Sequence, residues 1–179
     1  MSTNPVITLE ANSLYIATSQ IFGELGKFHW ILYLTDAAGV ATELQWMTLE
    51  ANHPSGKWEG VVIETVNETT TYLKNYAVVF AYMKVKGFTS PGLEAFKKVA
   101  LEAFPEDKRL GYATLQENRA AGLTCRTWVL YVISHIQDAG WLQRKETPQW
   151  FEETVKSISV GLEQEVERGE LNASHVLAI

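Results

Sequence analysis

The residue with the clearest chemical potential is Cys125, the only cysteine among 179 residues. It follows a loop that ends in Gly122, and an apolar stripe at helical spacing begins at Trp128. Thr124 can cap such a helix, which would place the thiol beside unpaired backbone N–H groups and the positive end of the helix dipole. Both effects favour thiolate and can lower a free thiol's pKa of about 8.5 by a unit or more. The pattern predicts either an activated nucleophile or, since cysteine is often buried, a small apolar core residue.

A nucleophilic thiol needs a base within about 3 Å, and the chain has four histidines. His53 falls in a predicted turn, and His175 falls in the C-terminal tail. His135 would lie almost three turns after Cys125 on the same helix, so it cannot reach the thiol. His29 differs, because it interrupts an apolar strand where burial must be offset by a hydrogen-bond partner. We therefore predict His29 as the general base, with a core histidine bonded to a carbonyl as the alternative.

Strand patterns fill the first half of the chain. Residues 28–34 are apolar on both faces apart from one histidine, which is typical of a central strand. Three further strands are predicted over residues 40–48, 58–66 and 72–85, and short turns between the four indicate an antiparallel meander. Residues 6–17 are predicted as an edge strand.

The strand over residues 40–48 alternates strictly. One face carries Thr42, Leu44 and Trp46, and the other carries Glu43 and Gln45. The two polar side chains therefore share a face, and they are candidates for a third group that orients the base.

The second half of the chain changes to helical patterns. A helix begins near residue 90 with Pro91 at its first position and ends at Pro105, and the cysteine helix follows a polar stretch at 106–122 that is a short helix or an ordered loop. A last helix begins at residue 147, and the tail at 169–179 is expected to be frayed or loosely docked. Strands followed by helices predict one α+β domain over residues 1–179, strand-rich at 6–86 and helical at 90–168.

Composition excludes several classes of function. The chain is 46% hydrophobic with a net charge of −6 and no basic stripe, so we expect no nucleic-acid partner. A single cysteine excludes an internal disulfide and suits a reducing compartment. No secretory signal and no apolar run of about 20 residues is visible, so we expect a cytoplasmic protein without integral membrane association. No Cys/His cluster has metal-ligand spacing and no glycine-rich phosphate loop occurs, so no metal or cofactor is predicted.

Two motifs resemble a known enzyme superfamily. Phe-His-Trp-Ile-Leu-Tyr-Leu at residues 28–34 is similar to the His-Trp-Ala-hydrophobic-Tyr strand of lecithin:retinol acyltransferase-like proteins. Thr-Cys-Arg-Thr-Trp-Val at residues 124–129 resembles their Asn-Cys-Glu-His-Phe-Val helix start. Those proteins form the circularly permuted branch of the NlpC-type, papain-like thiol enzymes, in which the histidine precedes the cysteine, as it does here. Small fungal proteins with a Phe-His-Trp strand and a Cys-Arg-Thr-Trp-Val helix are also similar.

The resemblance implies a permuted papain-like fold and assigns roles by position. Cys125 would be the nucleophile, His29 the base, and the backbone N–H of Cys125 part of an oxyanion hole. The family's third polar group is usually a histidine on the next strand, for which Glu43 and Gln45 are the nearest stand-ins. A carboxylate would orient the imidazole and stabilise its cation, and an amide oxygen would do so more weakly.

The implied chemistry is acyl transfer by a thiol hydrolase or acyltransferase: a thiolate attacks an amide or ester carbonyl, and water or an acceptor amine resolves the thioester. The family's Asn is Thr124 here and its Glu-His is Arg-Thr, which puts the substrate in doubt. Trp30, Trp46 and Trp128 are candidates to line the substrate pocket with Arg126, although tryptophans at such spacing are also core residues.

The lipid-handling relatives act at membranes through an apolar anchor that this sequence lacks, so a small-molecule or peptide amide or ester is the expected substrate. The alternative is a catalytically inactive binding or interaction protein of the same fold. The oligomeric state is left open.

Overall fold

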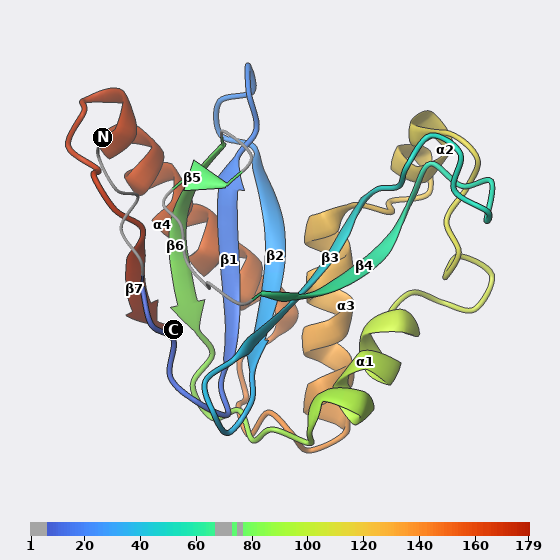
Figure 1. Cartoon of the computed structure of the whole chain (residues 1–179), viewed down its shortest axis with the longest axis horizontal. Helices are drawn as coiled ribbons and strands as arrows, with labels where there is room; N and C mark the ends of the chain where they lie inside the picture. Colours follow the sequence, from blue (N-terminus) through green and yellow to red (C-terminus); the bar gives the residue numbers. More distant parts are fainter. Residues whose placement is uncertain (1–6, 67–72, 75–76) are drawn as a thin grey trace.

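The computed structural model describes residues 7–66, 73–74 and 77–179, and these form one sheet with helices packed against it (Figure 1). The α+β class predicted from the sequence is confirmed. The strands are β1 (Leu14–Gln20), β2 (Phe28–Thr35), β3 (Ala41–Thr48), β4 (Glu59–Val66), β5 (Leu73–Lys74), β6 (Ala77–Lys84) and β7 (His175–Ala178). The helices are α1 (Leu93–Leu101), α2 (Leu115–Ala120), α3 (Cys125–Asp138) and α4 (Pro148–Glu167).

The sheet is a meander only from β1 to β4. Its order is β4-β3-β2-β1-β6-β5, so β6 returns to pair with β1 rather than continuing beyond β4. The prediction of an edge strand near the N-terminus is therefore wrong: β1 begins at Leu14 and lies between β2 and β6. Its first residues are fully buried, as are the central residues of β6, and strands apolar on both faces belong inside a sheet. Part of the predicted strand at 72–85, residues 72 and 75–76, lies outside the described residues.

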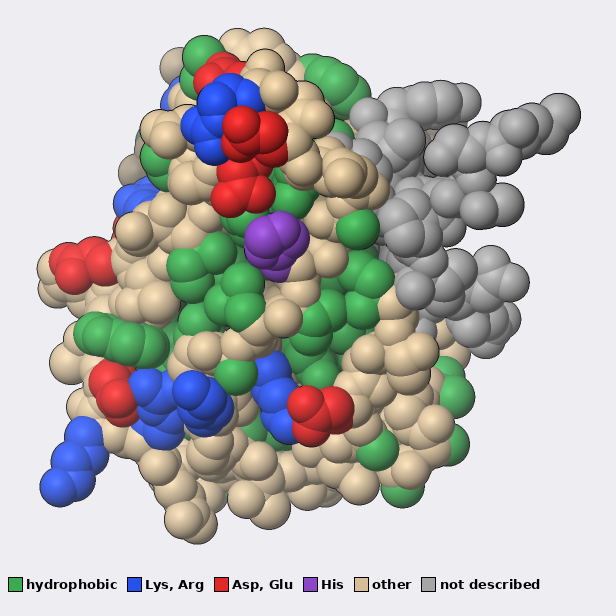
Figure 2. All heavy atoms as spheres, turned by 90° about the vertical axis from the view of Figure 1, so that its left-hand side faces the viewer, with side chains coloured by type: hydrophobic (Ala, Val, Ile, Leu, Met, Phe, Trp, Pro, Cys, Tyr) green, Lys and Arg blue, Asp and Glu red, His purple; other side chains and the backbone are tan. Residues whose placement is uncertain are grey.

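The C-terminal tail is not loose, which corrects the expectation for residues 169–179. Strand β7 pairs in parallel with β6, and the Ile179 N–H donates to the carbonyl of Lys84 at 2.9 Å. The Ser174 hydroxyl donates to the carbonyl of Val79, and Leu171 is buried. Figure 2 views the molecule from the side on which β7 lies, and hydrophobic side chains reach the surface there between clusters of charged ones.

Helices α3 and α4 cover one face of the sheet. Helix α3 packs on β2 and β3, and α4 packs on β1 and β6. The apolar face of β3 predicted from alternation faces these helices, because Leu44 and Trp46 belong to the main core together with the α3 stripe that includes Val129 and Val132. The opposite face carries a second, smaller apolar cluster that includes Ile31 and Tyr33 of β2.

Helix α1 begins two residues later than predicted. Its N-cap is Gly92, with a φ of 88° that a residue with a Cβ rarely adopts, and Pro91 lies outside the helix. The helix ends at Leu101, although Phe104 beyond it is still buried. Within the part of the chain that the structure describes, no helix combines the length and the apolar character that crossing a membrane requires.

Candidate active site

Cys125 is the first residue of α3, as the sequence predicts. The chain turns at Gly122, where φ is 74°, and a reciprocal capping box then begins the helix. The Thr124 hydroxyl accepts from the N–H of Thr127 at 3.0 Å, and the Thr127 hydroxyl accepts from the N–H of Thr124 at 2.9 Å. The cap pairs the N–H of Thr127, and the first N–H groups of any helix lack a backbone partner within it, so the half-buried thiol lies at the positive end of the helix dipole.

His29 lies at the start of β2, against which this end of α3 packs (Figure 1). Its Nε2 donates to the side-chain oxygen of Gln45 on β3 at 2.6 Å. An imidazole has two nitrogens, so this bond leaves Nδ1 for the thiol of Cys125 and fixes the neutral tautomer in which Nδ1 is the acceptor. The structure thus places Cys125 and His29 close together: they line one hollow, and each shifts the pKa of the other through a side-chain hydrogen bond.

The pKa values of the two groups move in the directions that an ion pair requires. Burial by itself raises the pKa of the Cys125 thiol, but the hydrogen bond and positive charge of His29, with the N–H groups of Trp30 and Arg126, bring that pKa below its ordinary value. Burial by itself lowers the pKa of His29, but the thiolate, then Gln45 and Glu43, raise it above its ordinary value. Both shifts reduce the free-energy cost of forming thiolate and imidazolium from the neutral pair.

Gln45 and Glu43, the two candidates for the third group, act in series. The side-chain nitrogen of Gln45 donates to a carboxylate oxygen of Glu43 at 2.5 Å, so Gln45 touches the imidazole and Glu43 orients Gln45. The other carboxylate oxygen of Glu43 accepts from the Tyr33 hydroxyl at 2.8 Å. Burial, and then the charge of Glu43, raise the pKa of Tyr33 well above its ordinary value, so the phenol stays a donor.

Tyr33 is a member of this hydrogen-bonded chain that sequence reasoning missed. In β2 it lies four residues after His29, on the same face, and it pairs directly across from Glu43 in the sheet register. Strict alternation along the strand was the signal that could have found it.

Two hollows meet at Cys125. One, of about 360 Å³, is lined by Trp30, Thr124 and Arg126 among others, and the second, of about 330 Å³, is lined by His29 and Trp46 among others. Both include Ile21, Arg119 and Cys125 in their walls. An extended substrate could therefore lie across the thiol with one part in each hollow.

The predicted substrate-binding tryptophans are placed differently from one another. Trp30 and Trp46 are 1% exposed, yet an edge of each reaches one hollow. Trp128 is fully buried and its indole N–H donates to the carbonyl of Ala100 at 3.0 Å, and we assign it to the core, the alternative role. Arg126 lines the first hollow and lies 3.4 Å from Glu152 of α4.

Arg119 and Glu59 form a second polar cluster at the groove. Glu59 is buried at the start of β4, and its carboxylate accepts from both guanidinium Nη atoms of Arg119, at 2.8 and 3.2 Å. It also accepts from the Trp46 indole at 3.3 Å and the Asn118 amide at 3.2 Å, and Arg119 donates to the carbonyl of Leu123 at 2.6 Å. This cluster fixes the loop before α3, and no local pattern signals it because its two charged members come from β4 and α2.

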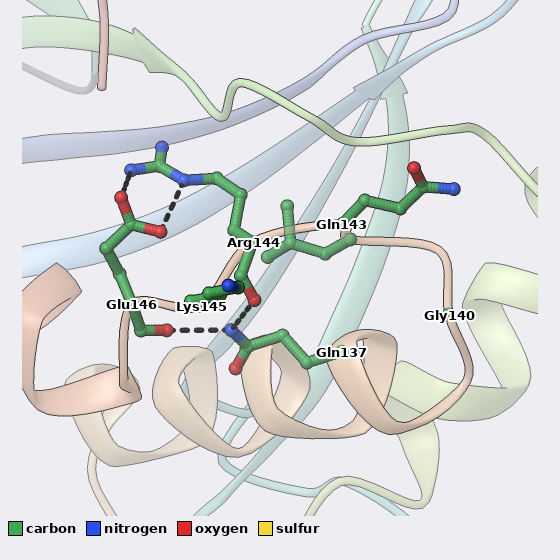
Figure 3. Close-up of a pocket in the computed structure, with 7 residues that line it drawn as sticks. Gln137, Gly140, Gln143, Arg144, Lys145 and Glu146 are labelled. Atoms are coloured by element: carbon green, nitrogen blue, oxygen red, sulfur yellow. Dashed lines mark hydrogen bonds and ion pairs between the residues drawn. The ribbon is translucent and has the colours of Figure 1, made fainter.

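A larger hollow, of about 810 Å³, lies at the other end of α3 (Figure 3). Gln137 donates to the carbonyls of Arg144 and Glu146, at 3.3 and 2.7 Å, and the guanidinium of Arg144 holds the Glu146 carboxylate at 3.0 and 2.6 Å. These bonds tie the loop between α3 and α4 to the helix. Neither Cys125 nor any histidine lines this hollow, so the predicted chemistry belongs to the smaller pair.

In the described residues no group of three or more His, Cys, Asp or Glu side chains is arranged to hold a metal ion. Comparison of the chain with family models, curated proteins and solved structures gave no match.

Proposed function

We propose that the protein is a cysteine-dependent acyl-transfer enzyme, a hydrolase or acyltransferase of the permuted NlpC/papain-like type. The observation that carries the proposal is the thiol of Cys125 at the first turn of α3, facing an imidazole that Gln45 holds through Nε2. The proposed nucleophile, base and orienting group come from α3, β2 and β3, and Cys125 lies where the two hollows meet. A site of this composition supports covalent catalysis at a carbonyl.

The proposed first half-reaction forms a thioester. Nδ1 of His29 holds the proton taken from the thiol, and the thiolate attacks the carbonyl carbon of an amide or ester. The oxyanion that forms lies near the N–H of Cys125 at the helix start, where backbone donors and the dipole stabilise negative charge. The imidazolium then gives its proton to the leaving nitrogen or oxygen, the bond to the leaving group breaks, and the acyl group remains on sulfur.

The second half-reaction releases the acyl group. His29 takes a proton from water or from an acceptor amine, whose oxygen or nitrogen attacks the thioester carbonyl. The tetrahedral adduct collapses, the carbon–sulfur bond breaks and the thiol is restored. Gln45 keeps the imidazole in one orientation through both halves, and Glu43 and Tyr33 keep Gln45 in place. The cytoplasm is the proposed compartment, since this chemistry needs a reduced thiol.

An activated ester tests the proposal. With p-nitrophenyl acetate, we expect a burst of nitrophenolate equal to the protein concentration and an acetyl group on Cys125, seen by mass spectrometry and removed by hydroxylamine. The Cys125→Ala variant should give no burst, and His53→Gln, which removes an exposed histidine, should behave as the parent. A folded parent that gives neither burst nor adduct would point to the alternative, a binding or interaction protein of the same fold.

A further inference from the structure

The two hollows beside Cys125 differ in charge. The hollow that contains Arg126 is also lined by Lys27, Arg119 and Lys156, and its lining residues include no Asp or Glu. The hollow that contains His29 has one acid and one base, Glu59 and Arg119, and apart from His29 and Cys125 themselves its other lining residues are uncharged. In a chain whose net charge is −6, a cationic wall on one side of the nucleophile is unexpected.

Two of the four cationic side chains that line this hollow each have a carboxylate partner of their own. Arg119 is held by both oxygens of the buried Glu59 carboxylate, and Lys27 pairs with Glu24 at the surface. Glu163 also lies near this wall, but its buried carboxylate accepts the N–H of Gly26 at 2.9 Å.

Arg126 and Lys156 must share one carboxylate, that of Glu152. The same oxygen of Glu152 lies 2.6 Å from the Lys156 ammonium and 3.4 Å from Nε of Arg126. Nε of Arg126 is buried and makes no hydrogen bond to any described residue. Both cationic side chains remain about two-fifths exposed, at 41% and 40%. Two positive charges therefore face one carboxylate, and the exposed parts of both side chains leave one positive charge in excess at the hollow that they line.

We propose that the substrate of this site carries a carboxylate, or a comparable small anion, close to its reacting carbonyl, and that Arg126 and Lys156 bind it. The inference rests on the proposed function, because it names which part of an acyl substrate lies on which side of the thiol. The anionic part occupies the hollow lined by α3 and α4, and the uncharged part lies toward His29 and Trp46. The substrate class is thus an acidic amide, ester or peptide.

Three methanethiosulfonates that differ chiefly in the charge of the group they transfer test the proposal on the full chain. The thiolate attacks the sulfenyl sulfur of each reagent, a disulfide forms and methanesulfinate leaves. The probes are the methyl reagent, which is neutral, the 2-sulfonatoethyl reagent, which is anionic, and the 2-(trimethylammonium)ethyl reagent, which is cationic. Each rate is divided by the rate of the same reagent with 2-mercaptoethanol, and the quotient of the anionic over the cationic value is the charge preference. That quotient does not depend on the thiolate fraction.

We expect a charge preference above one in the parent protein. Lys156→Gln and Arg126→Gln should each lower it about threefold, and Glu152→Gln should raise it by a similar factor, as expected for one unit charge some ångströms away in a watery groove. Added salt should bring all of these values toward one. Opposite signs from two members of one ion-pair cluster would not arise from a general loss of structure.

Arg168→Gln provides the matched control, since it also removes an ion-paired cation from the end of α4 but about 18 Å along the helix from Lys156. It should leave the charge preference unchanged. A charge preference at or below one in the parent would overturn the anion site. So would a charge preference in the Lys156, Arg126 and Glu152 variants that equals that of the parent. If the neutral reagent reacts with Cys125 no faster than with 2-mercaptoethanol, the result counts against an activated thiol. The charge preference would still decide the anion site.

Discussion

At the scale of single residues, Gln45 determines how His29 can act. Its amide oxygen accepts the Nε2 proton, and its amide nitrogen is anchored on the buried carboxylate of Glu43. A flip that exchanges the amide oxygen and nitrogen of Gln45 would therefore place two donors or two acceptors against each other. This dictates the tautomer in which Nδ1 is free to take a proton from Cys125.

Replacing Gln45 by Leu should lower both reactivity and stability. Hydrogen bonds to charged groups contribute about 1.5–3 kcal/mol, so the labelling rate of Cys125 by iodoacetamide at pH 6 should fall at least about tenfold. The buried Glu43 carboxylate would lose a donor, which should lower the free energy of unfolding in urea by about 1–3 kcal/mol. Gln143→Leu, at an exposed position in the hollow at the other end of α3, serves as control. Unchanged labelling in the Gln45 variant would show that the imidazole is oriented by something else.

At the scale of elements, the start of α3 brings the thiol to the imidazole. Thr124 and Thr127 close the first turn through a reciprocal cap, and the stripe from Trp128 onward anchors the helix in the core. The sequence predicts both features because each is local: a cap residue and a helical period suffice to locate them.

Thr124→Ala should separate the local role of the cap from its contribution to stability. Loss of a helix cap costs about 1 kcal/mol, and here the helix start that carries Cys125 should loosen, so its labelling by iodoacetamide at pH 6 should slow. Thr147→Ala removes the equivalent cap of α4, whose hydroxyl accepts from the N–H of Trp150 at 3.2 Å. Thr147→Ala should lower the free energy of unfolding by a similar amount without changing the labelling rate of Cys125. Equal rates in both variants would contradict a role of the α3 cap in positioning the thiol.

The loop between α3 and α4 gives the protein an acid-sensitive element. The Arg144 guanidinium holds the pKa of Glu146 at about 2, below its ordinary value. A lowered pKa in the folded state stabilises the fold at pH values above the unfolded-state pKa of about 4.3, and this stabilisation is lost as pH falls toward 2. Glu146→Gln should therefore melt at a lower temperature than the parent at pH 7 and at the same temperature near pH 2. A gap in melting temperature that stays constant over this range would refute the assignment.

The long-range part of the fold was beyond a reading of local patterns. Alternation along residues 40–48 places Glu43 and Gln45 on one face, as observed, but nothing local says that β6 pairs with β1 or that the tail adds β7. The order of strands in a sheet depends on which strands must bury both of their faces. This is a property of the whole sheet and cannot be read from one segment. The Glu59–Arg119 cluster was missed for the same reason, since only the folded chain brings β4 next to α2.

At the scale of the whole molecule, the sheet and α3 meet so that the thiol opens into a groove rather than into the core. The histidine strand precedes the cysteine helix along the chain, the order that the permuted thiol enzymes share. The groove has one cationic and one largely uncharged end, with Cys125 between them. This placement gives a substrate access to the thiol, as the proposed function requires.

The central claim is that His29 makes Cys125 a thiolate near neutral pH, and the pH dependence of alkylation by iodoacetamide tests it most directly. Because the pKa of Cys125 lies below its ordinary value, the parent rate should fall less steeply than that of a free thiol as pH falls from 8 toward 6. In His29→Gln, burial of the thiol is no longer offset, so the rate should fall about tenfold for each pH unit over this range. His53→Gln should follow the parent. Parent and His29→Gln profiles that coincide, both falling as a free thiol does, would contradict the account.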